Sequence, residues 1–464
     1  MSPASPATAS PPPAPPAYRP RHPEQLPTYR LLERHFEAYV RVHEERFAER
    51  HGTLRAVVSR SVNQYLECGR LRSGFVRIRC PTCREEHLLA FSCRTRNLCA
   101  SCQAKRAVLF GERLCAEIVA PVAHRHMVFT VPIVLRGLVE RDRSLLGLIA
   151  RIAYEATVRV MRVAGAPGEE GVAGSANGAR NGPPRTAVPG MVASIQTFGS
   201  YANFHPHIHA IVAEGLFALD GTFHAIPCPP AWVFEEVFRR LLLAAFVRAE
   251  RLSEEFCDRL LSWRHSGFSV FVGTRIEAED RARLEHLGRY VTRPAFPADA
   301  VTLRADGRVE IKTPRDPKTG SESIELDPLA FVHAMVTQIP DAKKHLVRYY
   351  GGYSHRMRAT VRAQNAAVGA VTGDGGEPSG APGASPEPVT PAERGSPEAK
   401  RRSAWRRLLQ KQFEVDPLLC PKCGTVMKVV AFITERATID RILGHREETG
   451  LVSPFEPRGP PSAE

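Results

Sequence analysis

The spacing of the cysteines is the feature that most restricts how this chain can fold. Of the 11 cysteines among 464 residues, seven lie between Cys68 and Cys115, and two more form the Cys-Pro-Lys-Cys motif of residues 420–423. Closely spaced Cys-x-x-Cys pairs in cytosolic proteins bind metal ions more often than they form disulfides. An odd total also fits a complete set of disulfides poorly. We therefore expect small metal-organised modules rather than a disulfide framework.

Two Cys-x-x-Cys pairs lie close together in the N-terminal part of the chain. Cys80 and Cys83 form one pair, Cys99 and Cys102 form the other, and 15 residues separate them. Two thiolate pairs at this spacing can close a tetrahedral zinc site, and four protein ligands leave no position open for catalysis. The spacing predicts a structural zinc on these four cysteines. The same segment contains further residues that could join it or complete a second site: Cys68, His87 and Cys93.

The C-terminal pair, Cys420 and Cys423, is half of such a site. It needs His445, or ligands from elsewhere in the chain, to bind zinc. Upstream, the segment from Lys400 to Lys411 has six basic residues, no acidic residue and one tryptophan. A positive stripe with an aromatic residue is typical of nucleic-acid binding, although a merely soluble helix has the same composition. The DNA contacts expected here are Arg401, Arg402, Arg406 and Arg407.

Basic residues are in excess, with 63 Lys and Arg against 49 Asp and Glu, which gives a net charge of +14. Such an excess suggests a polyanionic partner. Between Cys68 and Cys115 there are ten basic residues and three acidic ones. We expect this segment to contact DNA phosphates, the alternative being a solvated basic face without a ligand. The residues expected to make these contacts are Arg94, Arg96, Lys105 and Arg106.

Composition also divides the chain into segments. With 43% hydrophobic and 24% charged residues, most of it should fold. No apolar run reaches the roughly 18 residues of a membrane helix, and the N-terminus lacks a signal pattern, so we expect a cytoplasmic, nucleoid-associated protein. The predicted segments are a disordered tail (1–26), a helix with a zinc module (27–118), a mixed domain (119–365) with a disordered insertion (164–184), a disordered linker (366–399) and a basic C-terminal module (400–464).

Hydrophobic patterning predicts the elements of the mixed domain. Short apolar runs at residues 126–132, 190–198, 203–212 and 268–276 are typical of strands, and residues 231–263 and 278–290 of helices. Two alternating runs within residues 301–313 are joined by Asp306-Gly307, which is a strong hairpin signal. Strands with antiparallel neighbours, mixed with helices, indicate an α+β fold.

Three histidines alternate along one predicted strand, at His205, His207 and His209. In a strand these positions share one face, so the three imidazoles should converge. Burying them without partners would cost several kcal/mol in aggregate, so we predict a metal site. His124 and His126 have the same spacing, but an arginine lies between them at the start of a strand, and we interpret them as a chance match.

These residues resemble a known family. His207-Ile208-His209 is similar to the His-hydrophobe-His motif of the HUH endonucleases. The chain more closely resembles the rolling-circle insertion-sequence transposases of this type that carry an N-terminal zinc-binding domain. Six segments carry the resemblance in the family's order, over most of residues 60–440: FSCRTRNLCASCQAKR, HMVFTVP, IQTFGSYANFHPHIHAIV, LGRYVTRPAF, LVRYYGGYS and PLLCPKCGTVM.

The resemblance implies a fold, a chemistry and a nucleophile. Residues 119–365 would form an HUH catalytic domain, an antiparallel sheet flanked by helices. A tyrosine would attack a phosphate in single-stranded DNA and give a 5′-phosphotyrosine and a free 3′-OH, with Mg²⁺ or Mn²⁺ but no nucleotide cofactor. Tyr290 matches the family's nucleophile. Two-tyrosine members have a second tyrosine four residues earlier, where this chain has His286, which suggests a single-tyrosine mechanism.

Other assignments stay open at this point. Tyr349 and Tyr353 also lie four residues apart, but the two glycines between them disfavour a helix, so these are weaker candidates for the nucleophile. The third metal ligand is either His205, which precedes a proline, or Gln196 on the preceding strand. Further phosphate contacts would be Arg289 and Lys312.

The function that these features predict is a transposase that nicks and joins single-stranded DNA at element ends. One alternative is a rolling-circle replication initiator or relaxase with the same chemistry. A second is a zinc-containing nucleic-acid-binding protein without catalysis, and a third is hydrolysis by a metal-bound water. The chain has no P-loop match, so helicase or replication factors would come from the host.

Overall fold

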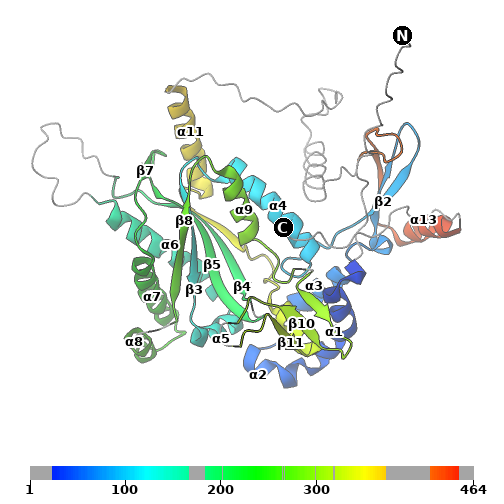
Figure 1. Cartoon of the computed structure of the whole chain (residues 1–464), viewed down its shortest axis with the longest axis horizontal. Coiled ribbons are helices and arrows are strands. Elements are labelled where there is room, and N and C mark those ends of the chain that lie inside the picture. Colours follow the sequence, from blue (N-terminus) through cyan, green and yellow to red (C-terminus); the bar gives the residue numbers. More distant parts are fainter. Residues whose placement is uncertain are drawn as a thin grey trace, which may run out of the picture. The chain divides into compact units, whose positions relative to one another are not determined.

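The computed structural model describes residues 23–166, 183–371 apart from 201, 264, 266, 298, 317 and 318, and 418–448. The predicted tail, insertion, linker and basic segment around Arg401 lie largely outside the described residues. The described residues form two compact units, one built from residues 23–26, 64–93 and 418–448 and the other from residues 27–63, 94–166 and 183–371. Figure 1 shows the elements of each unit.

The smaller unit is a three-stranded antiparallel sheet. Its strands are β1 (Phe75–Arg79), β2 (Glu86–Ala90) and β13 (Lys428–Ile433), in the order β13-β1-β2. The hairpin of β1 and β2 comes from the N-terminal cysteine segment, and β13 follows the C-terminal Cys-x-x-Cys pair. Phe75 lies opposite Ile433 in the sheet. The two segments that the sequence assigned to separate modules therefore share one sheet. Short helices complete the unit: η2 (Leu71–Ser73) and α13 (Arg436–Glu448).

The larger unit is built on a five-stranded sheet in which every neighbouring pair is antiparallel. The strand order is β12-β4-β5-β3-β8, so β5 lies in the middle. This confirms the predicted α+β fold with a central antiparallel sheet. The strands are β3 (His124–Thr130), β4 (Gly190–Phe198), β5 (Phe204–Ala213), β8 (Ser269–Ile276) and β12 (Val347–Gly351).

Helices cover both faces of this sheet (Figure 1). Along β5, Ile208, Ala210 and Val212 enter one hydrophobic core, while Ile211 and Ala213 enter the other, as period-two alternation requires. The first core is completed by α5 (Ile133–Arg141), α6 (Leu145–Ala164), α7 (Ala231–Arg248) and α8 (Glu254–Ser262). The second is completed by η3 (Leu114–Ile118), α9 (Arg281–Val291) and α11 (His355–Val371), with α4 (Ala100–Arg113) packed against α9.

In the larger unit, α10 (Pro328–Thr337) packs against α1 (Pro27–Arg46). The predicted hairpin at Asp306-Gly307 is present as β9 (Val301–Leu303) and β10 (Val309–Lys312). The other elements of this unit are α2 (Ala48–His51), most of α3 (Ala56–Leu66), β6 (Gly215–Phe217), β7 (Phe223–Ala225) and β11 (Ser323–Leu326). The short η1 (Pro23–Gln25) belongs to the smaller unit.

Two predicted boundaries differ from the structure. The helix expected over residues 231–263 is two helices, because Glu250 adopts a left-handed φ of 55° and Ser253 caps α8 by accepting a hydrogen bond from the Phe256 N–H. In addition, α11 continues to Val371, into the stretch predicted as linker. No helix in the described residues is long and apolar enough to cross a membrane.

The close approach of β12 to the chain before β4 gives a test of the fold. Gly351 has a φ of +54°, and a Cβ there would lie 1.9 Å from the Pro189 carbonyl oxygen. Gly307 has a φ of +84° but open space around it, so it is the matched control. We expect Gly307→Ala to cost about 1 kcal/mol from backbone strain alone, and Gly351→Ala to lower the thermal unfolding midpoint substantially more. Equal midpoints for the two variants would contradict this packing.

Candidate functional site

Two histidines of β5 converge on one point. The side chains of His207 and His209 are buried, and their Nε2 atoms lie 3.1 Å apart. Two imidazole nitrogens on one ion, each about 2.1 Å from it, would be about 3.0 to 3.4 Å apart. Burial lowers the pKa of His207 to about 4 and that of His209 to about 2, so both rings are neutral at physiological pH. The pair thus has the geometry and protonation state of metal ligands.

The opposite ring nitrogens of both histidines are held by hydrogen bonds. His207 Nδ1 lies 2.7 Å from the His205 carbonyl oxygen, to which only an N–H can donate. His209 Nδ1 lies 2.9 Å from His126 Nε2 on the neighbouring strand β3. With Nδ1–H as donor in both rings, each Nε2 presents its lone pair to the point of convergence.

His126 is the site residue that the sequence reasoning discarded. Its ring stacks on that of His209, with centroids 5.1 Å apart and planes at 11°. Antiparallel pairing of β3 with β5 puts it there, because Val128 lies opposite His209 and His126 is on the same face. The histidine at position 124 has a different surrounding: its Nε2 is 2.6 Å from the Tyr353 hydroxyl in a fully buried pair. The signal that could have found His126 is its place on a strand adjacent to the histidine strand.

Gln196 and His205 are the two candidates for a third ligand beside His207 and His209. Gln196 lies opposite His207 on β4 and is buried. Its Nε2 donates to the Val291 carbonyl at 2.9 Å, whereas its buried Oε1 has no partner among the described residues. In the described part of the chain, no His, Cys, Asp or Glu, His205 included, joins His207 and His209 in a three-ligand cluster.

Tyr290 lies at the end of α9 against these histidines. Its ring centroid is 5.5 Å from that of His209 and 6.0 Å from that of His126, both edge-on. The Arg293 guanidinium lies 4.3 Å from the tyrosine ring centroid, and the tyrosine is 37% exposed. The next carbonyl, that of Val291, accepts hydrogen bonds from Ser194 and Gln196, which ties the end of α9 to β4. His286, one turn earlier, is exposed.

The alternative tyrosines have other surroundings. Tyr353 is fully buried with its hydroxyl bonded to His124, and burial raises its pKa. Tyr349 lies edge-on to His355 at 5.8 Å, and burial raises the pKa of its hydroxyl as well. Tyr350 stacks on Tyr154 with centroids 4.8 Å apart. These contacts are those of packing residues.

The cysteines of the smaller unit form a four-ligand cluster, but with partners other than those the sequence predicted. Cys80 and Cys83 meet Cys420 and Cys423, not the Cys99–Cys102 pair. The sulfur atoms of Cys80 and Cys423 are 3.5 Å apart and those of Cys83 and Cys420 are 3.3 Å apart, near the separation of about 3.8 Å around a tetrahedral zinc. The prediction was wrong on this pairing because β13 joins β1, which brings a distant Cys-x-x-Cys pair to the first one.

The two turns that present these cysteines have the same backbone form. In one, the Arg84 N–H donates to the Cys80 carbonyl, and in the other the Gly424 N–H donates to the Cys420 carbonyl. Arg84 and Gly424 both have a positive φ, of 62° and 69°. Two copies of one tight turn thus face each other with four sulfur atoms between them. Neither His87 on β2 nor His445 on α13 belongs to the cluster.

The other cysteines named from the sequence lie as follows. In the smaller unit, the Cys93 N–H lies 3.4 Å from the Cys68 sulfur. In the larger unit, Cys99 is the N-cap residue of α4 and Cys102 lies in its first turn, both of them buried.

Several of the predicted DNA-contacting residues are engaged within the protein. Arg96 donates to the carbonyl oxygens of Asp341, at 3.0 Å, and of Lys344. Arg106 donates to the Arg94 carbonyl at 2.9 Å. Arg289 pairs with Glu285 one turn earlier on α9. Of the remaining residues, Lys312 is exposed on β10, Lys105 lies on α4, and Arg401, Arg402, Arg406 and Arg407 lie outside the described residues.

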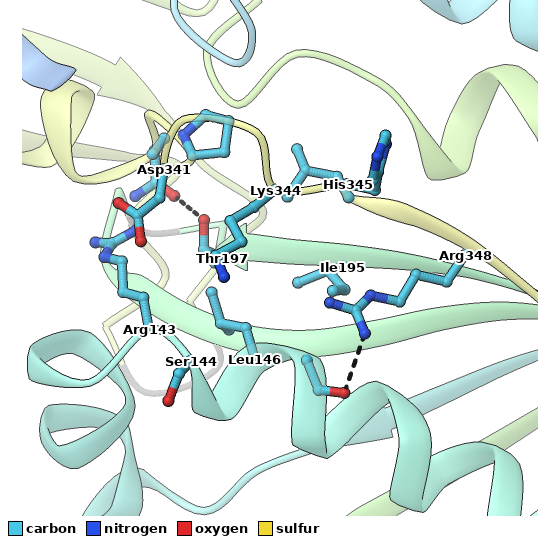
Figure 2. Close-up of a pocket in the computed structure, with 13 residues that line it drawn as sticks. Arg143, Ser144, Leu146, Ile195, Thr197, Asp341, Lys344, His345 and Arg348 are labelled. Atoms are coloured by element: carbon cyan, nitrogen blue, oxygen red, sulfur yellow. Dashed lines mark hydrogen bonds between the residues drawn. The ribbon is translucent and has the colours of Figure 1, made fainter.

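A basic cavity of about 90 Å³ lies on the other side of β4, where Ile195 and Thr197 point away from the histidines. Figure 2 shows cationic side chains around it from the loop before α6, from the loop before β12 and from β12 itself, with the Asp341 carboxylate among them. Burial lowers the pKa of Arg143 to about 9, and its Nε has no partner among the described residues. The charged or titratable lining residues are Arg143, Lys344, His345 and Arg348, together with one acid, Asp341.

Comparisons with known proteins agree on one type of relative. A family model described as “Putative transposase” matches residues 190–360, and one described as “Transposase zinc-binding domain” matches residues 39–131. The “Putative transposase y4qJ” of Sinorhizobium fredii is 25% identical over 307 residues, 61% of this chain and 71% of the relative. The transposase for insertion sequence element IS801 of Pseudomonas savastanoi pv. phaseolicola is 23% identical over 328 residues, 66% of this chain and 72% of the relative. No solved structure matches significantly.

The four-cysteine cluster gives a test that needs no DNA. Cys420→Ser should lower the zinc content by one ion per chain, because three thiolates remain where four are needed. Cys228→Ser, a change outside both Cys-x-x-Cys segments of the cluster, is the control and should leave the content unchanged. Zinc per chain would be measured by mass spectrometry of the purified full-length protein. An unchanged zinc content in Cys420→Ser would contradict the pairing of the two turns.

Proposed function

We infer that this chain is a transposase of the insertion-sequence type, since both family models and both relatives confirm the resemblance carried by its motifs. We propose that it nicks and joins single-stranded DNA at the element ends through a covalent bond to Tyr290. The observation that carries this proposal is the position of Tyr290 against His209, one of two buried histidines with converging Nε2 atoms.

The catalytic metal site that we propose has three protein ligands. They are His207 Nε2, His209 Nε2 and Gln196 Oε1, a buried oxygen without a partner in the described structure. Two imidazoles and an amide oxygen suit Mn²⁺ and tolerate Mg²⁺, and leave positions open for substrate oxygens. When bound, such an ion polarises the scissile phosphate and fixes its orientation. His205 Nε2 is also buried without a partner in the described structure, but His205 joins no three-ligand cluster with the other two, so it is the weaker alternative.

The chemical step that we propose is a transesterification. The Tyr290 hydroxyl oxygen bonds to phosphorus, the bond from phosphorus to the 3′ oxygen breaks, and the tyrosine proton is lost to solvent while the 3′ oxygen gains one. The products are a 5′-phosphotyrosine and a free 3′-OH. Because one phosphodiester replaces another, the 3′-OH of a second strand can reverse the step without a nucleotide cofactor. Arg293, beside the tyrosine ring, is suited to contact the same phosphate.

A single-tyrosine cycle fits the surroundings of the other candidates. His286 occupies the position one turn before Tyr290, and Tyr353 is fully buried. A replication initiator or relaxase would use the same chemistry, but the relatives that match are transposases. Neither hydrolysis by a metal-bound water nor a purely binding role needs a tyrosine beside the histidine pair, so both alternatives leave the position of Tyr290 unexplained.

DNA is the partner that this function requires. We propose that the basic side chains around the cavity, Arg143, Lys344 and Arg348, contact the DNA backbone, because they outnumber the one acid of the lining, Asp341. The exposed Lys312 would add to these contacts.

The covalent step is tested by adduct formation. The protein would be mixed with labelled single-stranded DNA from the element end and Mn²⁺, and denaturing gels would show whether label stays on the protein. Tyr290→Phe should abolish the adduct, because the attacking oxygen is gone. Tyr349→Phe is the matched control and should retain it. The proposal would be wrong if the Tyr290→Phe protein still formed the adduct. It would also be wrong if the wild-type protein cleaved the DNA without forming any adduct.

The role of Gln196 is tested by metal dependence. Gln196→Leu removes the ligand oxygen, so nicking should need at least tenfold more Mn²⁺ for half-maximal rate. Gln196→Glu keeps an oxygen at that position but loses the N–H donated to the Val291 carbonyl, and should stay near the wild type. If His205→Ala shifts the Mn²⁺ dependence and Gln196→Leu does not, the third ligand is His205.

A further inference from the structure

A second group of metal-ligating side chains lies in the larger unit among helices that take no part in the proposed nicking site. It contains His51 at the end of α2, Glu140 on α5 and His333 on α10. One ligand atom from each lies within 4.8 Å of the other two. His51 Nδ1 is 3.0 Å from one carboxylate oxygen of Glu140, and His333 Nε2 is 3.9 Å from the other.

The group is buried and incompletely paired. The side chains of Glu140 and His333 are only 8% and 11% exposed. Glu140 Oε1 and His333 Nε2 are both buried without a hydrogen-bond partner in the described structure, and they face each other at a distance too long for a hydrogen bond. No Lys or Arg of the described residues forms an ion pair with this carboxylate. Arg143 interacts electrostatically with this carboxylate but forms no ion pair with it, so Oε1 has no direct partner. A buried carboxylate oxygen left without one is costly, and these unsatisfied atoms indicate a missing cation between them.

The His333 ring is held with Nε2 toward the carboxylate. Its Nδ1 is 3.0 Å from the hydroxyl of Tyr39, a buried residue of α1. The ring also stacks on Phe47, with centroids 4.7 Å apart and planes at 12°. A hydrogen bond from Nδ1–H to the tyrosine oxygen leaves the Nε2 lone pair free for a metal. Such outer contacts typically orient a metal-binding histidine.

We propose that His51, Glu140 and His333 bind a divalent transition-metal ion, zinc foremost, which joins α2, α5 and α10. Two imidazoles and one carboxylate favour zinc and its neighbours in the first transition row over calcium and magnesium, which prefer a full set of oxygen ligands. The fourth ligand is water or His43, whose buried Nδ1 also has no partner in the described structure. The ion is structural, because it cross-links helices that come from residues 48–51, 133–141 and 328–337.

The alternative without a metal is an ion pair between Glu140 and a protonated His51. It would satisfy Oε2 but leave Oε1 and His333 Nε2 buried and unpaired, which is why the metal accounts for more of the geometry.

The test counts zinc in full-length protein in which the nicking site cannot bind metal. In a His207→Ala/His209→Ala background, His333→Phe keeps an aromatic ring to stack on Phe47 and removes the ligand. We expect it to lower the zinc content by one ion per chain, while the control His35→Phe on α1 changes nothing. An unchanged zinc content in folded His333→Phe protein overturns the proposal.

A second measurement does not depend on how the ligand variant folds. X-ray absorption at the zinc edge of the His207→Ala/His209→Ala protein should show nitrogen and oxygen neighbours at about 2.0 to 2.1 Å besides the sulfur neighbours at about 2.3 Å. A spectrum with sulfur neighbours alone would mean that the zinc is bound only by cysteines, and the proposal would be wrong. Neither readout uses DNA, so the result is independent of whether Tyr290 is the nucleophile.

Discussion

The position of β5 in the middle of the five-stranded sheet is the constraint on which the larger unit depends. Helices cover both faces of this strand, so nearly all its side chains are buried, and a shift of one residue would exchange its apolar and polar sides. In the observed register one side carries Ile208 and Ala210 into a hydrophobic core, and the other carries His207 and His209. The packing that stabilises the fold therefore also fixes the side of the sheet on which His207 and His209 lie.

The neighbouring strands and one helix complete this site. Strand β4 brings Gln196 opposite His207, strand β3 brings His126 to His209, and α9 ends where the Val291 carbonyl accepts two hydrogen bonds from β4. Because Tyr290 is the residue before that carbonyl, the bonds that fix the helix end also fix the proposed nucleophile. The one oxygen and two nitrogens that we assign to the catalytic metal come from two adjacent strands, which are a rigid support for a reaction that depends on orientation.

The smaller unit shows how a distant segment changes an assignment. Spacing alone favoured a zinc site formed by Cys80 and Cys83 with the next Cys-x-x-Cys pair, because sequence proximity was the only available guide to spatial proximity. Pairing of β13 with β1 replaces that pair with Cys420 and Cys423, some 340 positions away. The sequence predicted that each Cys-x-x-Cys turn binds metal, but it could not predict which two turns share one ion.

By itself, the sequence determined the local features: the strands with alternating or apolar runs, the turn at Asp306-Gly307, the alternating histidines of one strand and the motifs that resemble those of transposases. These follow from backbone periodicity and side-chain chemistry, which act over a few residues. Only the tertiary structure decided which cysteines meet, that His126 supports His209, that Gln196 keeps an oxygen free beside His207, and that His51, Glu140 and His333 come together. Each of these depends on which strands and helices lie side by side, and that is set by burial of the two cores as a whole.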